Sequence, residues 1–109
     1  MNNYRTRKLL LNLGINSSMR GFKYILMILP MLETKNKITM GEIYHNVYKR
    51  KEAKSPFDVE RGIRYAIEKS YKTKKILNKI YGRTPKVTEF LYDLVYNIDI
   101  FEEEIKNGR

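Results

Sequence analysis

Residues 55–72 carry the side chains best suited to recognition chemistry, because charged and aromatic groups recur there at helical spacing. When successive residues are placed 100° apart around a helix, six of these side chains fall on one face. They are Phe57, Arg61, Arg64, Tyr65, Glu68 and Lys72. Arginine can form two hydrogen bonds with guanine, glutamate can accept one from cytosine, and neighbouring cations can hold phosphates. This face could therefore recognise base pairs, although periodicity alone leaves an ordinary solvated face as the alternative.

The helix that positions this face has a clearly marked beginning. Ser55 can cap its first turn, and Pro56 suits the first helical position, where no backbone N–H is needed. Asp58 follows the cap by three residues, so its carboxylate can reach back to it and favours the positive helix end. The opposite face is small and aliphatic and is predicted to be buried. It comprises Val59, Ile63, Ala66, Ile67 and Ser70.

The stretch before this helix predicts a second helix, capped by Thr39 and running to about Lys51. Its inward positions are Ile43, Tyr44 and Val47. Residues 52–54 then form a compact turn. Such a turn sets two helices at a steep angle, so that the second can enter a major groove. The pair is predicted to be a helix-turn-helix with residues 56–72 as its recognition helix.

Four further helices are predicted, over residues 4–13, 19–34, 73–81 and 88–101. Two glycines supply left-handed helix ends, at Gly14 and Gly82. Ser17 or Ser18 should cap the helix that begins at residue 19, and Thr88 should cap the last helix. Pro30 should kink the second helix or end it early, because it lacks an N–H group.

These elements predict an all-α domain of six helices. We expect it to occupy residues 1–109 as a single domain, with a core at about residues 4–101. The charged tail, residues 102–109, is expected to fray.

Composition and charge narrow the functional class. The chain has 109 residues, no cysteine and a net charge of +10, which excludes a disulfide framework, a zinc finger and a thiol nucleophile. Residues 35–83 hold 14 basic and five acidic side chains, a net charge of +9, whereas residues 84–109 carry −3. The excess of basic side chains indicates a polyanionic partner, with nucleic acid first and an anionic membrane second; a generically basic protein is the alternative.

The longest apolar run, residues 25–32, is too short to span a bilayer, and we expect a soluble intracellular protein without a membrane partner.

Catalytic and metal-binding constellations are not recognisable in the sequence. His45 is the single histidine and is expected to be a surface or packing residue. Three adjacent carboxylates splay around a helix axis and are expected to be solvated; they are Glu102, Glu103 and Glu104. The nine tyrosines, interleaved with lysines, could stack the bases of single-stranded nucleic acid, but more often such residues line the edge of a core. We predict no enzyme, no metal and no cofactor.

The segment DVERGIRYAIEKSY, residues 58–71, resembles the recognition helix of the stage zero sporulation protein A family, response regulators of endospore-forming bacteria. That family has a V-E-R-x-I-R-x-A-I-E core at this place. The matching residues are Val59, Glu60, Arg61, Ile63, Arg64, Ala66, Ile67 and Glu68. LGINSSMRGFKYI, residues 13–25, is similar to the family's I-G-x-x-x-x-x-K-G-Y-x-Y-L segment. Further matches occur in order at Ile43-Tyr44, Tyr81-Gly82, Pro85 and Thr88-Glu89-Phe90, so the resemblance covers roughly residues 9–98.

The resemblance implies a six-helix effector domain that binds a short operator and regulates transcription in the cytoplasm, associated with the nucleoid. It implies that Glu60 and Arg61 face base edges and that Arg64 and Tyr65 lie near the DNA backbone. The helical projection agrees for Arg61, Arg64 and Tyr65 but places Glu60 at the margin of the exposed face. Together with the resemblance, it leads us to expect base contacts from Glu60, Arg61 and Tyr65. We expect phosphate contacts from Lys49, Arg50, Lys54, Arg64 and Lys72. Double-stranded DNA is the expected partner, with RNA polymerase and a second copy on tandem operator sites as further candidates.

Several features depart from the family pattern. Asp58 stands where the family has a basic residue, Tyr65 replaces a histidine, and His45 replaces a proline. The family also carries an N-terminal phosphoacceptor receiver domain, for which this chain has no room. The chain is therefore expected to be either the excised effector half of such a regulator or a natural stand-alone paralogue, and the start at Met1 favours the paralogue.

The alternative function is a protein-interaction module that keeps this fold but modulates a full-length sporulation regulator or RNA polymerase without binding DNA. Arg61 and Arg64 distinguish the two, because an interaction module has no need for both on its exposed face.

Overall fold

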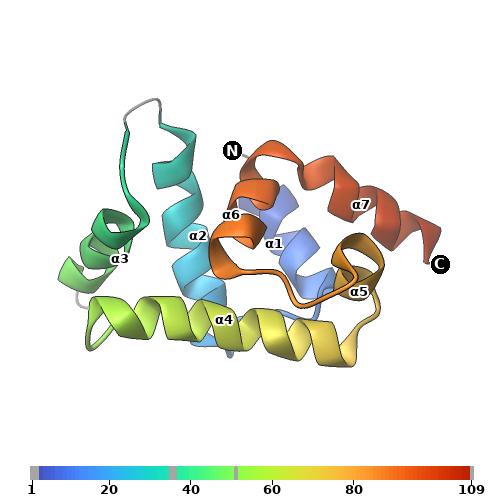
Figure 1. Cartoon of the computed structure of the whole chain (residues 1–109), viewed down its shortest axis with the longest axis horizontal. Helices are drawn as coiled ribbons and strands as arrows, with labels where there is room; N and C mark the ends of the chain where they lie inside the picture. The colour runs from blue at the N-terminus through green and yellow to red at the C-terminus, as the bar shows by residue number, and fades with distance from the viewer. Residues whose placement is uncertain (1–2, 35–36, 51, 109) are drawn as a thin grey trace.

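The computed structural model describes residues 3–34, 37–50 and 52–108, in which all regular structure is α-helical (Figure 1). These residues form α1 (Asn3–Asn12), α2 (Arg20–Glu33), α3 (Met40–Lys49), α4 (Pro56–Thr73), α5 (Ile76–Tyr81), α6 (Val87–Tyr96) and α7 (Ile98–Asn107). The predicted all-α class is confirmed. The described residues form seven helices rather than the six expected, because the last predicted helix is divided at Asn97.

The longest of these helices, α4, lies along one side of the domain (Figure 1). Its 18 residues span about 27 Å at 1.5 Å per residue. It packs mainly against α2 and α3 and also contacts α5 and α6. All seven helices contribute to a single apolar core. One side of α4 is buried in that core, and the other faces away from the domain.

Two glycines allow α2 and α4 to cross at close range. A Cβ atom added to Gly21 would lie 2.5 Å from the backbone oxygen of Gly62 and 2.9 Å from the Cβ of Ala66. A Cβ atom on Gly62 would lie 2.9 Å from a ring carbon of Tyr24. Only glycine at position 21 accommodates this approach, which brings the beginning of α2 beside the middle of α4.

The predicted glycine ends of α1 and α5 are confirmed. Gly14 has φ +80° and Gly82 has φ +71°. The N–H of Ile15 donates to the Leu10 carbonyl at 2.8 Å, and the N–H of Gly14 donates to the Leu11 carbonyl at 3.0 Å. This pair of bonds is the Schellman arrangement, which satisfies the last carbonyls of α1.

The predicted beginning of α2 is wrong. Met19 precedes the first helical residue, and no side chain caps it. Instead the Asn16 side chain accepts the N–H of Ser18 at 3.0 Å, because asparagine readily closes a turn onto the backbone two residues later. The helix does not end early at Pro30 but continues to Glu33.

Two other boundaries also differ from prediction. The helix α6 begins at Val87 rather than after Thr88, because the Glu89 carboxylate accepts the backbone N–H of Lys86 at 3.2 Å. The helix α4 runs to Thr73, so α5 begins three residues later than predicted, at Ile76. The helix α3 ends at Lys49, and the predicted end near Lys51 lies outside the described residues.

The C-terminal segment is helical rather than frayed, since α7 runs to Asn107. It is held by the buried Phe101, whose ring meets that of Phe90 edge-on at 5.6 Å between centroids. A two-pronged ion pair between Arg5 and Glu102 connects it to α1, with Nε to Oε2 at 2.7 Å. Tertiary packing of residues beyond 101 therefore overrides their polar composition.

Candidate nucleic-acid interface

The beginning of α4 has the predicted cap. The Ser55 side chain accepts the N–H of Asp58 at 3.2 Å, and Pro56 occupies the first helical position. The Asp58 carboxylate does not return to Ser55 among the described hydrogen bonds; it lies 3.8 Å from the Arg61 guanidinium instead. The carboxylate thus neutralises part of the charge on the outer face of α4.

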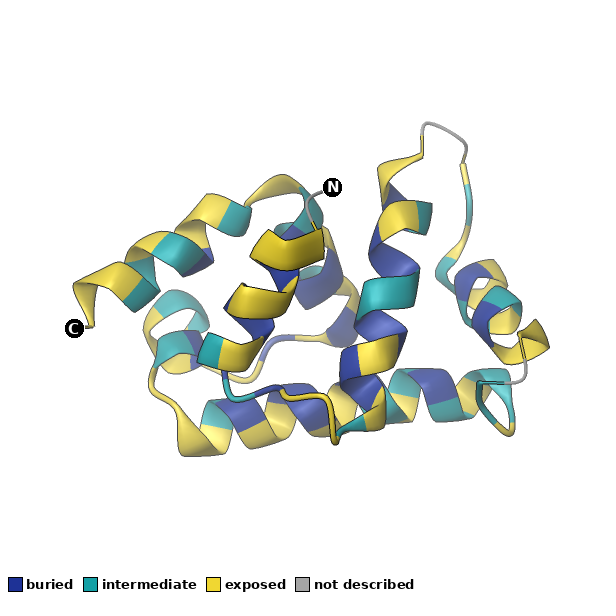
Figure 2. Cartoon of the chain, turned by 180° about the vertical axis from the view of Figure 1, so that it is seen from behind, coloured by how far each residue is buried: buried dark blue, intermediate teal, exposed yellow. Residues whose placement is uncertain are grey.

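The two predicted faces of α4 are confirmed. The five residues assigned to the inner face are the buried residues of this helix, and Figure 2 shows buried and exposed positions alternating along it. All six residues assigned to the outer face are exposed. Phe57 is 62% exposed and Tyr65 is 58% exposed, although both are aromatic. We call the line of Phe57, Arg61 and Tyr65, spaced one turn apart, the outer ridge.

The turn between α3 and α4 is fixed from α2. The Tyr24 hydroxyl donates to the Glu52 carbonyl at 3.0 Å, and Lys23 Nζ lies 2.5 Å from the Glu52 carboxylate. Ile43 and Val47 of α3 are fully buried. The angle between the two helices is thereby held by α2, and Lys54 is left exposed in the turn.

Glu60 lies at the margin of the exposed face, as the projection predicted. Its side chain is 26% exposed and forms an ion pair with Arg64, one turn further along. Nearby, Tyr44 is half-buried, and burial together with the Glu60 charge raises the pKa of its hydroxyl to about 12. Glu60 is therefore already paired, and it could accept a hydrogen bond from a base only by sharing or releasing Arg64.

The remaining predicted contacts are exposed at both ends of the motif. Lys49 and Arg50 lie at the end of α3, Lys54 lies in the turn, and Lys72 lies in the last turn of α4. Arg61 and Tyr65 share the outer ridge with Phe57.

Two cations beside the outer ridge were not predicted from the sequence. A shallow pocket with a volume of about 580 Å³ lies beside the ridge, and its lining includes Arg61, Tyr65, Lys69 and Arg20. Lys69 lies over the Tyr65 ring, with its Nζ 5.9 Å from the ring centroid. Its spacing of four residues from Tyr65 could have indicated this contact. No spacing in the sequence could have indicated Arg20, because it reaches the outer ridge through the close crossing of α2 and α4.

The other flank of α4 carries charge of both signs. It is a shallow surface between α3, α4 and the beginning of α6. Its ionisable side chains are Tyr44, Glu60, Arg64, Glu68, Lys86 and Glu89. Arg83 holds Glu89 through two bonds of 2.8 Å, and the pKa of that carboxyl is lowered mainly by this bond. The two flanks thus differ, with the Arg20 and Lys69 side the more basic.

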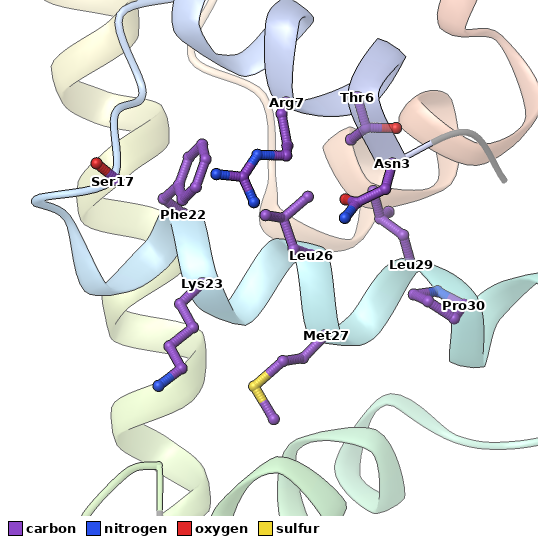
Figure 3. Close-up of a pocket in the computed structure, with 10 residues that line it drawn as sticks. All are labelled: Asn3, Thr6, Arg7, Ser17, Phe22, Lys23, Leu26, Met27, Leu29 and Pro30. Atoms are coloured by element: carbon purple, nitrogen blue, oxygen red, sulfur yellow. The ribbon is translucent and has the colours of Figure 1, made fainter.

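A separate groove between α1 and α2, of about 550 Å³, offers no acid–base pair. Figure 3 shows its lining, in which Arg7 points toward Phe22 with the guanidinium 5.6 Å from the ring centroid. Its described lining holds two cations, Arg7 and Lys23, and neither a carboxylate nor a histidine.

Across the described part of the chain, no three histidine, cysteine or acidic side chains gather as metal ligands would. No helix in those residues has the length and apolar character needed to cross a membrane.

Comparison with known protein families identifies the family of this chain. The family described as "Sporulation initiation factor Spo0A C terminal" matches residues 6–92, from α1 into α6. The matched span contains both helices of the helix-turn-helix and both flanks of α4. No curated protein and no solved structure matches the chain.

Proposed function

The chain belongs to the sporulation initiation factor Spo0A C-terminal family, and on that premise we propose that it is a sequence-specific DNA-binding regulator of transcription. The observation that carries the proposal is the outer ridge of α4. It faces away from the domain with an exposed arginine at its centre and basic side chains on the flank that Arg20 and Lys69 line. Membership in this family supports a regulatory role.

In this proposal α4 lies in the major groove, as the second helix of a helix-turn-helix does. Arg61 forms two hydrogen bonds with a guanine, the commonest specific contact of arginine with DNA. Tyr65 contacts the next base edge along the groove. Glu60 accepts from a cytosine amino group when Arg64 turns toward a phosphate.

The cations at the ends of the motif hold the DNA backbone. Lys49, Arg50 and Lys54 approach one side of the groove, and Arg64 and Lys72 approach the other. These contacts fix the register of α4 but carry no sequence information. A DNA partner also places the chain with the nucleoid in the cytoplasm.

A salt titration tests the proposal. Binding to duplex DNA is measured by gel shift at several salt concentrations for the wild type, Lys54→Ala and Lys72→Ala. Each lost phosphate contact should lower the slope of log affinity against log salt by about 0.9. Lys106→Ala is the matched control, because this exposed lysine lies on α7 and should leave the slope unchanged. Equal slopes for all four proteins would contradict the placement of α4.

A second candidate function, a module that acts only by pairing with another protein, is favoured by exposed apolar side chains away from α4. Tyr92 and Tyr96 of α6 stack with centroids 6.1 Å apart and are 40% and 63% exposed, and Ile100 of α7 is 46% exposed. In this second function, a full-length sporulation regulator or RNA polymerase would contact this surface, and α4 would not bind DNA. Loss of DNA binding in every salt condition would favour this second function alone.

A further inference from the structure

Phe57 is an exposed phenylalanine at the second position of α4. The other three phenylalanines, Phe22, Phe90 and Phe101, are buried in the core, whereas Phe57 is 62% exposed. Its exposure leaves little stabilising burial within the domain. The fold therefore does not account for an apolar ring at this position.

Phe57 has one described partner, and that partner is Arg61. The Arg61 guanidinium lies 5.5 Å from the centroid of the ring, a distance typical of a cation–π contact. The Asp58 carboxylate approaches the same guanidinium at 3.8 Å. The phenyl ring and the carboxylate together direct Arg61 along the outer ridge, and the ring itself protrudes beside it.

Within a major groove, a phenyl ring at this position has a specific complement. The 5-methyl group of thymine is the apolar group on the base edges there, and phenylalanine is one of the side chains that contact it. The first residues of a recognition helix are those that reach base edges. One helical turn, 5.4 Å, separates Phe57 from Arg61 along the axis, so the two side chains can reach neighbouring base pairs.

We propose that Phe57 is a specificity-determining residue, packing against the 5-methyl group of a thymine next to the guanine that Arg61 binds. The inference rests on the proposed insertion of α4 into the major groove. It adds a preference for thymine, set by an apolar contact, to the base contacts proposed for Arg61, Glu60 and Tyr65.

The test uses the duplex that the wild-type chain selects from random DNA. Each thymine in turn is replaced by uracil, which pairs identically but lacks the 5-methyl group, and affinity is measured for the wild type and for Phe57→Ser. At one thymine the wild type should lose roughly fourfold in affinity, the value of one buried methyl group. Phe57→Ser should bind the thymine duplex and the duplex with uracil at that position with equal affinity. Melting curves of both proteins should coincide closely, because the ring is exposed.

The outcomes separate this inference from the proposed function. If the wild type keeps its sequence preference but tolerates uracil at every position, Phe57 does not recognise thymine, and the inference is overturned alone. An equal loss in both proteins would assign the methyl contact to another side chain and would also overturn it. Failure of the wild type to select any sequence would overturn the proposed function as well.

Discussion

Replacing Asp58 by arginine reverses a charge in the first turn of α4, beside the guanidinium of Arg61. The Asp58 side chain is 29% exposed, lies in the first turn of the helix and faces the Arg61 guanidinium at 3.8 Å. In the folded protein it stabilises the positive helix end and the ion pair. Against DNA it places a negative charge near the phosphates that the neighbouring cations would contact.

The cost to stability follows from those two contacts. A carboxylate in the first helical turn contributes about 0.3–1 kcal/mol through the helix dipole. A partly exposed ion pair contributes about 0.2–1 kcal/mol, and the distance of 3.8 Å places this one near the lower end. Asp58→Arg should therefore destabilise the domain by about 1 kcal/mol, which lowers the Tm by about 4 °C at this size.

The effect on DNA binding has the opposite sign. A cation that reaches one additional phosphate steepens the salt dependence of log affinity by about 0.9. A fourfold reduction in salt concentration should then increase the advantage of Asp58→Arg over the wild type by about 3.5-fold. Asp58→Asn is the matched control, because it removes the carboxylate charge without adding a cation. Its slope of log affinity against log salt should steepen by less than the 0.9 or so that one phosphate contact contributes.

The assay pairs a melting curve with a salt titration of DNA binding on the same three proteins. Asp58→Arg should melt lower and bind more tightly, most clearly at low salt. Unchanged affinity at low salt would mean that residue 58 does not face the DNA backbone, and the placement of α4 in the groove would be wrong.

Three further predictions concern the base contact, the crossing and the added cation. Arg61→Ala should cost about 1–3 kcal/mol of affinity and relax the preference at one base pair; an equal loss on every duplex in competition binding would make Arg61 a phosphate contact. Gly21→Ala should destabilise the fold by about 1–3 kcal/mol in chemical unfolding, because its Cβ would meet a backbone oxygen at 2.5 Å. Gly41→Ala is the control, with its nearest atom at 3.9 Å, and a similar effect of both would contradict the close crossing. Lys69→Ala should lower the salt slope by about 0.9, and an unchanged slope would remove Lys69 from the interface.

The faces of α4 were predictable because they depend on local rules. The cap at Ser55 and the 3.6-residue period fix where the helix begins and which side chains point outward, whatever the rest of the chain does. The same period placed Glu60 at the margin of the exposed face. Its pairing with Arg64 is also local, since the two residues lie one turn apart.

The features that escaped prediction depend on contacts between distant segments. Arg20 lies beside the outer ridge because Gly21 lets α2 approach α4 closely, and no periodicity in the sequence indicates that crossing. The last predicted helix is divided at Asn97, where the sequence has neither glycine nor proline, and Phe101 of its second part packs against Phe90 of its first part. Packing of this kind likewise keeps residues 102–107 helical.

Recognition of a DNA sequence by the outer ridge of α4 can be tested by selecting bound duplexes from random DNA with the purified wild-type chain and with Arg61→Ala. The wild type should enrich one short motif containing a guanine at a fixed position. Arg61→Ala should lose the preference for that guanine and retain the other positions of the motif. If the wild type enriches no motif, or if both proteins enrich the same motif, the outer ridge does not recognise a DNA sequence through Arg61.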